Sequence, residues 1–255
     1  MTLNYKILGQ GFPVIILHGL FGSLDNWLTF GKKIEDAGFM AILIDQRDHG
    51  KSPHSDTFNY TLLADDVYQF MMDHWIHEAI IIGHSMGGKT AMTLTKNYPE
   101  VVSKLIVIDI SPEKYAVGHS NEFDALFSLD LDTIGSRKEA EIQLTDKLHQ
   151  PDTVQFFLKN LGRNSDHTFA WKFNLPLLYK DYQNILDAVV FEHTCDIPTL
   201  FVKGGKSPYI SKNAEITISQ MFSQVEIITI PSAGHWVHAD ALHELLSVVL
   251  KFIQS

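Results

Sequence analysis

The feature that most constrains the fold of this chain is the alternation of short apolar runs with longer stretches of helical periodicity. The runs are four or five residues long and mostly β-branched, as expected of strands that are buried on both faces of a sheet. They cover residues 14–17, 40–44, 79–82, 105–108, 199–202 and 227–230. The candidate helices between them cover residues 26–37, 62–74, 86–97, 212–222 and 240–253. We therefore expect an α/β fold with a mostly parallel central sheet, helices on both faces and a functional site at the carboxyl ends of the strands.

One interval interrupts this alternation. Residues 111–196 contain no run typical of a buried strand, and their pattern is mixed and helical. The candidate helices there cover residues 123–129, 136–148, 153–161 and 175–185. An insertion of this size, after the strand that ends at Asp109, would lie above the strand ends as a helical cap. We expect residues 1–110 and 197–255 to form the core domain and residues 111–196 the cap; a set of ordinary crossover helices is the alternative.

Composition and charge exclude several classes of partner. Thirty Asp and Glu against 20 Lys and Arg give a net charge of −10, with no basic run, so a nucleic-acid partner is not expected. The longest clean apolar run, residues 39–44, is far shorter than the ~20 residues that span a bilayer. The N-terminal residues lack the pattern of a signal peptide, and Cys195 is the single cysteine. We expect a cytoplasmic protein without membrane insertion.

The nucleophile is predicted from Gly83-His84-Ser85-Met86-Gly87, which matches the G-x-S-x-G pattern. The motif follows the apolar run 79–82 directly and precedes the candidate helix 86–97. A tight strand-to-helix turn of this kind projects the serine Oγ, and the flanking glycines tolerate the close backbone packing. The alternative is a plain glycine turn; we predict that Ser85 is a nucleophile.

A serine hydroxyl needs an adjacent base, and after such an elbow the acid and then the histidine follow along the chain. His235 comes directly after the last apolar run, in Ser232-Ala233-Gly234-His235-Trp236, which places it at a carboxyl strand end. A surface loop histidine is the alternative. His238 lies three residues further on, but no H-E-x-x-H or H-x-H pattern supports a metal pair. We expect His235 to be the base, with no metal and no cofactor.

The acid is predicted at an unusual position. Most enzymes of this type carry an aspartate after the strand that resumes beyond the insertion, but the loop at residues 204–209 has no carboxylate. Asp196 precedes that strand and Glu215 lies inside the next helix. Asp109 ends the strand that follows the nucleophile's strand, so it can reach a histidine beside Ser85 and hold its tautomer. Capping of the turn before Pro112 is the alternative reading of Asp109.

Other polar positions have supporting roles. Ser207 stands where the commoner pattern has its acid, and we expect it to hydrogen-bond the Asp–His pair as a fourth member. The glycine-bearing turn at residues 18–23 follows the first run, so the backbone N–H groups of Leu20 and Met86 are the predicted oxyanion donors. His18 is expected to brace its loop by hydrogen bonds. Asp45 and Arg47 are expected to pair with each other and to take no part in the chemistry.

Taken together, these motifs resemble the α/β-hydrolase fold family over essentially the whole chain and, within it, the small bacterial YbfF-type esterases. The resemblance rests on residues 18–26, 83–89, 109–112, 204–209 and 234–238. It implies a serine hydrolase whose acid follows the strand after the nucleophile's, and relatives that are carboxylesterases, some with acyl-CoA thioesterase activity. The cap resembles the family weakly, so substrate identity is not implied.

The expected function is hydrolysis of short- to medium-chain acyl esters, with acyl-CoA thioesters as a further small-molecule substrate class. A serine nucleophile argues against haloalkane dehalogenases and epoxide hydrolases, which use aspartate at this position. Three alternatives stay open: C–C bond hydrolysis of a dienoate, cofactor-free perhydrolysis, and a hydrolase fold that serves as a small-molecule receptor. Multiple turnover would separate an enzyme from a receptor.

Overall fold

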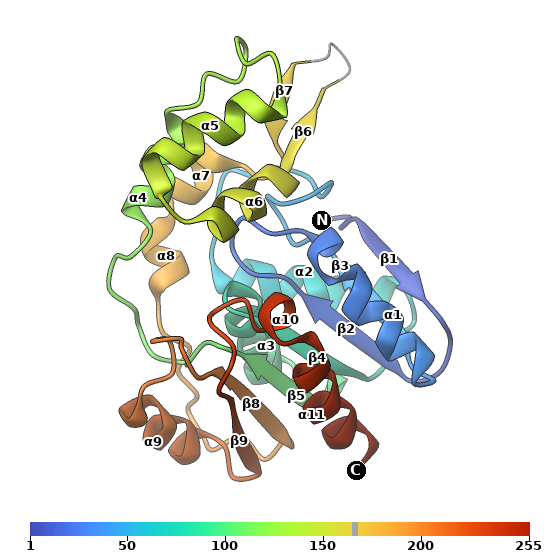
Figure 1. Cartoon of the computed structure of the whole chain (residues 1–255). Helices are drawn as coiled ribbons and strands as arrows, with labels where there is room; N and C mark the ends of the chain where they lie inside the picture. The colour runs from blue at the N-terminus through green and yellow to red at the C-terminus, as the bar shows by residue number, and fades with distance from the viewer. Residues whose placement is uncertain (165–167) are drawn as a thin grey trace.

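A seven-stranded central sheet organises the molecule, with strand order β1-β3-β2-β4-β5-β8-β9 (Figure 1). The computed structural model describes residues 1–164 and 168–255. The strands of the sheet are β1 (Tyr5–Leu8), β2 (Pro13–Leu17), β3 (Met40–Ile44), β4 (Ala79–His84), β5 (Val102–Ile108), β8 (Thr199–Gly204) and β9 (Val225–Ile230). All neighbouring pairs are parallel except β1 and β3. The predicted fold class is confirmed.

Helices cover both faces of this sheet because its central strands are apolar on both sides. In β2, Ile15 and Leu17 belong to one core cluster, while Val14 and Ile16 belong to another, as the two-residue period of a strand requires. Figure 1 shows α1 and α11 in front of the sheet and α2 and α3 behind it. The helices of this part of the chain are α1 (Leu28–Asp36), α2 (Tyr60–Asp73), α3 (Met86–Asn97), α9 (Lys212–Met221), α10 (Val237–Asp240) and α11 (Leu242–Gln254), with 3-10 turns η1 (Leu24–Trp27) and η2 (Pro99–Val101).

Two details of this region differ from the sequence expectation. Strand β1 was not predicted, because it is an edge strand whose Tyr5 and Ile7 side chains are 40% and 42% exposed. The predicted helix 240–253 is interrupted at Ala241, which separates α10 from α11. None of the helices that the structure describes is long and apolar enough to cross a membrane.

The described part of residues 111–196, here named the cap segment, forms a layer of its own (Figure 1). It contains α4 (Ser120–Phe127), α5 (Arg137–Leu148), α6 (Pro151–Lys159), α7 (Leu175–Lys180), α8 (Tyr182–Leu186) and the strand pair β6 (Leu161–Arg163) and β7 (Phe169–Trp171). Its apolar side chains, among them Phe123, Leu144 and Phe157, form a separate cluster with a few core residues such as Met86. The exact division of the chain into core and cap stays a prediction.

Within the cap segment, two elements differ from the expectation. The helix expected over residues 175–185 is broken at Asp181, whose carboxylate accepts a hydrogen bond of 2.8 Å from the backbone N–H of Phe58. The short antiparallel pair β6–β7 was not predicted. Each of its strands is three residues long, which is too short to leave a periodic signal in the sequence.

Candidate active site

Ser85 lies on the sharp turn between β4 and α3, with φ +52° and ψ −119°. Non-glycine residues rarely adopt positive φ, and such strain is common at functional sites. The turn is fixed by a 3.0 Å hydrogen bond from Ser85 N–H to the carbonyl of Ile108 on the neighbouring strand. A Cβ added at Gly83 would lie 2.1 Å from the carbonyl oxygen of Gly87, and one at Gly87 would lie 2.3 Å from that of Leu17. Glycine is therefore required on both sides of the serine.

Ser85, His235 and Asp109 are brought together by hydrogen bonds. His235 Nε2 lies 3.0 Å from Ser85 Oγ, and His235 Nδ1 lies 2.7 Å from Asp109 Oδ2. The carboxylate can only accept, so Nδ1 carries the proton and Nε2 is left to accept the serine proton. This is the arrangement of a nucleophile, a general base and the acid that orients the base.

Asp109 emerges from the end of β5 with φ +50° and a completely buried side chain. Because β5 lies between β4 and β8 in the sheet, Asp109 stands between the strand end that carries Ser85 and the 204–209 loop, and its carboxylate binds this loop. Its Oδ1 accepts a 2.9 Å hydrogen bond from Gly204 N–H. Asp196 instead accepts from Ser223 Oγ at 2.6 Å, and Glu215 pairs with Lys203 at 2.9 Å. Neither of these two carboxylates takes part in the cluster.

Ser207 also belongs to the cluster, since its Oγ donates to Asp109 Oδ2 in a short hydrogen bond and accepts from Tyr209 N–H at 3.3 Å. Two neighbours of His235 were not predicted. The ring of Tyr209 stacks on the imidazole, with centroids 4.0 Å apart and an interplanar angle of 20°. Nε2 of the His84 ring lies 2.8 Å from the carbonyl oxygen of His235. Tyr209 belongs to the 204–209 loop and His84 to the G-x-S-x-G motif. No sequence pattern indicates that either side chain contacts the histidine.

The turn that carries Leu20 lies close to the nucleophile. A Cβ added at Gly19 would lie 3.3 Å from Ser85 Cβ, and Leu20, Ser85 and Met86 line one cavity together. Met86 is the first residue of α3, so its N–H has no acceptor within the helix. The role of these two N–H groups stays a prediction.

His18 braces this turn as expected. Its Nε2 accepts from Gln46 N–H at 3.1 Å, and its Nδ1 lies 2.9 Å from the Gly19 carbonyl oxygen. Burial lowers the pKa of His18 to about 4, so the ring is neutral and can make one bond as donor and the other as acceptor. Both ring nitrogens of His18 are therefore engaged by backbone groups.

The expected pair between Asp45 and Arg47 is wrong. Arg47 Nε donates instead to Asp66 on α2 at 2.6 Å, in a buried ion pair. The carboxylate of Asp45 accepts from the backbone N–H groups of Leu24 at 2.7 Å and Lys51 at 2.9 Å. Both residues follow the end of β3, and Arg47 lies in a turn, so each side chain binds a different neighbour.

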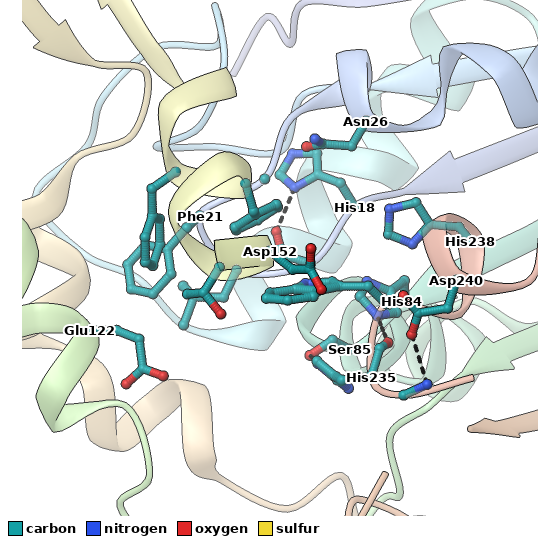
Figure 2. Close-up of a pocket in the computed structure, with 18 of the residues that line it drawn as sticks. His18, Phe21, Asn26, His84, Ser85, Glu122, Asp152, His235, His238 and Asp240 are labelled. Carbon is teal, nitrogen blue, oxygen red and sulfur yellow. Dashed lines mark hydrogen bonds between the residues drawn. The ribbon is translucent and has the colours of Figure 1, made fainter. Parts of the chain in front are cut away.

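Two cavities meet at Ser85. The first has a volume of about 550 Å³ and is here named the polar chamber, because three carboxylate-bearing residues line it beside His235: Glu122, Asp152 and Asp240. Its other lining residues include the aromatic side chains Phe21, Trp27, Phe156, Phe157 and Trp236. Figure 2 shows Glu122 on one side of this chamber and His238 and Asp240 on the other. The second, the apolar chamber, has about 370 Å³ and is lined mainly by Leu20, Tyr60, Met86, Ile110, Tyr115, Ile185 and Leu186. Both chambers include Leu20, Ser85, His119, Pro208 and Tyr209.

Lys89 is the one cationic side chain among the described residues that line the two chambers. Its Nζ donates to the carbonyl oxygens of Glu113 at 2.8 Å, Leu186 at 3.3 Å and Asp187. These acceptors match its three N–H groups. Burial lowers the pKa of Lys89 to about 7. The side chain thus ties α3 to the places where the chain enters and leaves the cap segment.

The described residues contain no group of three or more His, Cys, Asp or Glu side chains suited to hold a metal ion. A model of the α/β-hydrolase fold family matches residues 13–242. The chain belongs to this family. The resemblance predicted from the motifs is confirmed, because the esterase YbfF of Escherichia coli (strain K12) is 33% identical over 94% of this chain and 92% of its own length.

Two further α/β-hydrolase relatives are similar along the whole chain. A putative esterase/lipase of Haemophilus influenzae is 39% identical over 99% of this chain and 84% of its own length. A solved structure described as a marine microorganism esterase has a TM-score of 0.95 and 38% identity, and the match covers 98% of both chains. The cap segment is included in these matches, so the likeness extends beyond the core sheet.

Proposed function

We propose that this protein is a serine carboxylesterase that hydrolyses short- to medium-chain acyl esters through an acyl-enzyme. Its relatives, named as esterases and a putative esterase/lipase, make it an ester hydrolase at the coarser level. The observation that carries the finer proposal is the hydrogen-bonded series Ser85 Oγ, His235 and Asp109. A serine held at 3.0 Å from an oriented imidazole is the arrangement that acyl transfer needs.

In this mechanism Ser85 Oγ attacks the ester carbonyl while His235 Nε2 takes the serine proton. Asp109, fully buried and hydrogen-bonded to Nδ1, stabilises the imidazolium that forms. Ser207 supports the carboxylate, and the N–H groups of Leu20 and Met86 receive the oxyanion. The imidazolium then gives its proton to the alcohol oxygen, the alcohol leaves, and a water activated by His235 hydrolyses the acyl-enzyme.

The two chambers give the substrate its orientation. The departing alcohol must receive its proton from His235, which lines the polar chamber and not the apolar one. The alcohol therefore lies in the polar chamber. The acyl chain lies in the apolar chamber, where Met86, Ile110 and Leu186 exclude water from it. The size of this chamber, about 370 Å³, favours short to medium chains.

The same lining bears on the other candidate functions. A dienoate substrate for C–C hydrolysis carries carboxylates, and no arginine is among the described residues that line either chamber. Coenzyme A carries phosphates, which the carboxylates of Glu122, Asp152 and Asp240 would repel from the polar chamber. Oxygen esters of uncharged alcohols fit better than acyl-CoA thioesters.

The proposal is tested with p-nitrophenyl esters and acyl-CoA thioesters of the same acyl chains, from two to sixteen carbons. We expect many turnovers per enzyme on the short and medium esters, a fall in kcat/KM for long chains, and weak activity on the thioesters. A single stoichiometric acylation without turnover would instead indicate a receptor. Activity on long-chain triglyceride emulsions alone would contradict the expected chain length.

A further inference from the structure

His119, the residue before the first turn of α4, is a cap residue whose imidazole reaches the junction of the two chambers. Nothing in the sequence marked it. Its Nδ1 lies 2.5 Å from the hydroxyl of Tyr182. That hydroxyl is also approached by the backbone N–H groups of Gly118 at 3.4 Å and His119 at 3.1 Å.

These contacts determine the tautomer of His119. A tyrosine hydroxyl has one proton to donate and two lone pairs that accept. Two backbone N–H groups occupy the lone pairs of Tyr182, so its proton is donated to His119 Nδ1. Burial lowers the pKa of His119 to about 4, so the neutral ring carries its proton on Nε2. This N–H has one long contact, 3.4 Å to the hydroxyl of Tyr209, and is available as a donor.

Glu122 lies in the first turn of α4, three residues after His119, which directly precedes the helix. It lines the polar chamber (Figure 2). Among the residues that the structure describes, no side chain or backbone group donates a hydrogen bond to its carboxylate, and the side chain is half-buried. The chamber thus presents a neutral donor, His119, and an anionic acceptor, Glu122, from the start of α4.

We propose that His119 and Glu122 select esters whose alcohol carries a further free hydroxyl group, as in the monoester of a polyol. The hydroxyl oxygen accepts from His119 Nε2–H, and a hydroxyl proton is donated to the Glu122 carboxylate. A hydroxyl can both donate and accept, whereas an ionised carboxylate can only accept and an alkyl chain can do neither. This inference rests on the proposed esterase function and on the placement of the alcohol in the polar chamber.

The test compares two esters with the same acyl chain and the same alcohol carbon count, glycerol 1-monobutyrate and propyl butyrate. The measured quantity is the ratio of their kcat/KM values, obtained by titrating the released acid. We expect Glu122→Ala and His119→Phe each to lower the ratio of glycerol to propyl ester by about five-fold or more, because each removes one hydrogen bond to the hydroxyl. Tyr182→Phe removes the hydroxyl that donates to His119 Nδ1, so either ring nitrogen can then carry the proton. This variant should lower the ratio less than the other two.

Asp124→Ala is the matched control, because Asp124 is an exposed carboxylate on the same helix that lines neither chamber. It should leave both kcat/KM values unchanged. If Glu122→Ala and His119→Phe reduce both esters equally, the two residues are only structural and the inference is wrong. If the wild-type enzyme hydrolyses propyl butyrate and its variants keep the wild-type ratio, the esterase proposal stands and the inference fails. Absence of turnover on both esters would overturn the esterase proposal and this inference with it.

Discussion

The core and the cap segment contribute to the active site in different ways. In the core, the reacting side chains are fixed by backbone geometry: Ser85 and Asp109 stand at adjacent strand ends with φ of +52° and +50°, held by hydrogen bonds to neighbouring strands. In the cap segment, Glu122 lies in α4 and His119 directly precedes this helix, which packs on other cap helices. The sheet therefore positions the predicted catalytic residues, whereas the proposed choice of alcohol depends on the position of the cap segment.

The largest expected effect is the loss of kcat when the acid in the core is replaced. Asp109→Asn should lower kcat by about 10⁴-fold, because the amide can stabilise the wrong tautomer of His235. The protein should stay folded, which circular dichroism would check. Asp196→Asn and Glu215→Gln are the matched controls and should stay within a few-fold of wild type, since both carboxylates bind elsewhere. Near-normal turnover by Asp109→Asn together with an inactive Glu215→Gln would reject this assignment.

Lowering the pH should reduce the stability of both the core and the cap segment. Burial lowers the pKa of five histidines, to about 4 for His18 and His119, about 3 for His49 and His238, and well below the ordinary value for His84. In the unfolded chain these groups titrate near 6.5. Their contribution to stability is therefore complete above about pH 6.5 and is lost as the pH falls toward about 4, because the unfolded chain then binds more protons.

We accordingly expect the Tm to fall steadily between about pH 6.5 and about pH 4. Because His18, His49 and His84 lie in the core and His119 in the cap segment, hydrogen exchange should show both regions losing protection together. A Tm that stays constant over this range would contradict the buried, neutral state of these rings. Loss of protection in the cap segment alone would show that the two regions respond to acid separately.

The connection between the two regions is tested by Lys89→Met. This change leaves the carbonyl oxygens of Glu113, Leu186 and Asp187 without their shared donor, at a cost of about 2 kcal/mol. Hydrogen exchange should become faster at the two connections to the cap segment and stay slow in β4 and β5. Lys104→Met is the control, because Lys104 donates to Phe252 and Ser255 at the far end of the molecule. Equal loosening of the whole chain would contradict a local role of Lys89.

The smallest expected effect concerns Ser207. Ser207→Ala removes one hydrogen bond to Asp109, worth about 1 kcal/mol or roughly five-fold in kcat. Ser223→Ala is a matched control, because it removes a similar serine–aspartate contact, with Asp196, far from the nucleophile. An unchanged kcat in Ser207→Ala would show that this serine does not support Asp109 in catalysis. A loss of kcat as large as that of Asp109→Asn would show that the serine takes part in the reaction directly.

The core was predictable because its chemistry follows the strand ends. Ser85, Asp109 and His235 each come within a few residues of the end of an apolar run that forms a strand, so the sheet topology alone brought them to one edge. The edge strand β1 escaped prediction because exposure removes the apolar signal. The pairing of Asp45 with Arg47 was wrong because proximity in sequence does not determine which side chains of a folded loop meet.

The residues of the cap segment that reach the chambers could not be predicted in this way. His119 precedes α4 and Glu122 lies in it. The position of this helix depends on contacts between segments far apart in sequence, such as that of His119 with Tyr182. No local period records such contacts. Tyr209 belongs to the 204–209 loop that the sequence analysis singled out. Its stacking on His235 depends on how this loop is placed relative to the loop after β9, which the sequence pattern does not record.

The most direct test of the account is the site of covalent labelling by a fluorophosphonate, an electrophile that reacts with an activated serine. We expect one phosphonyl group per wild-type chain, located by peptide mass spectrometry on Ser85. We also expect no adduct in Ser85→Ala and much slower labelling in Asp109→Asn, because His235 is then no longer oriented to take the serine proton. Labelling that persists in Ser85→Ala, or an adduct on another residue of the wild-type protein, would contradict the claim that the core holds this nucleophile.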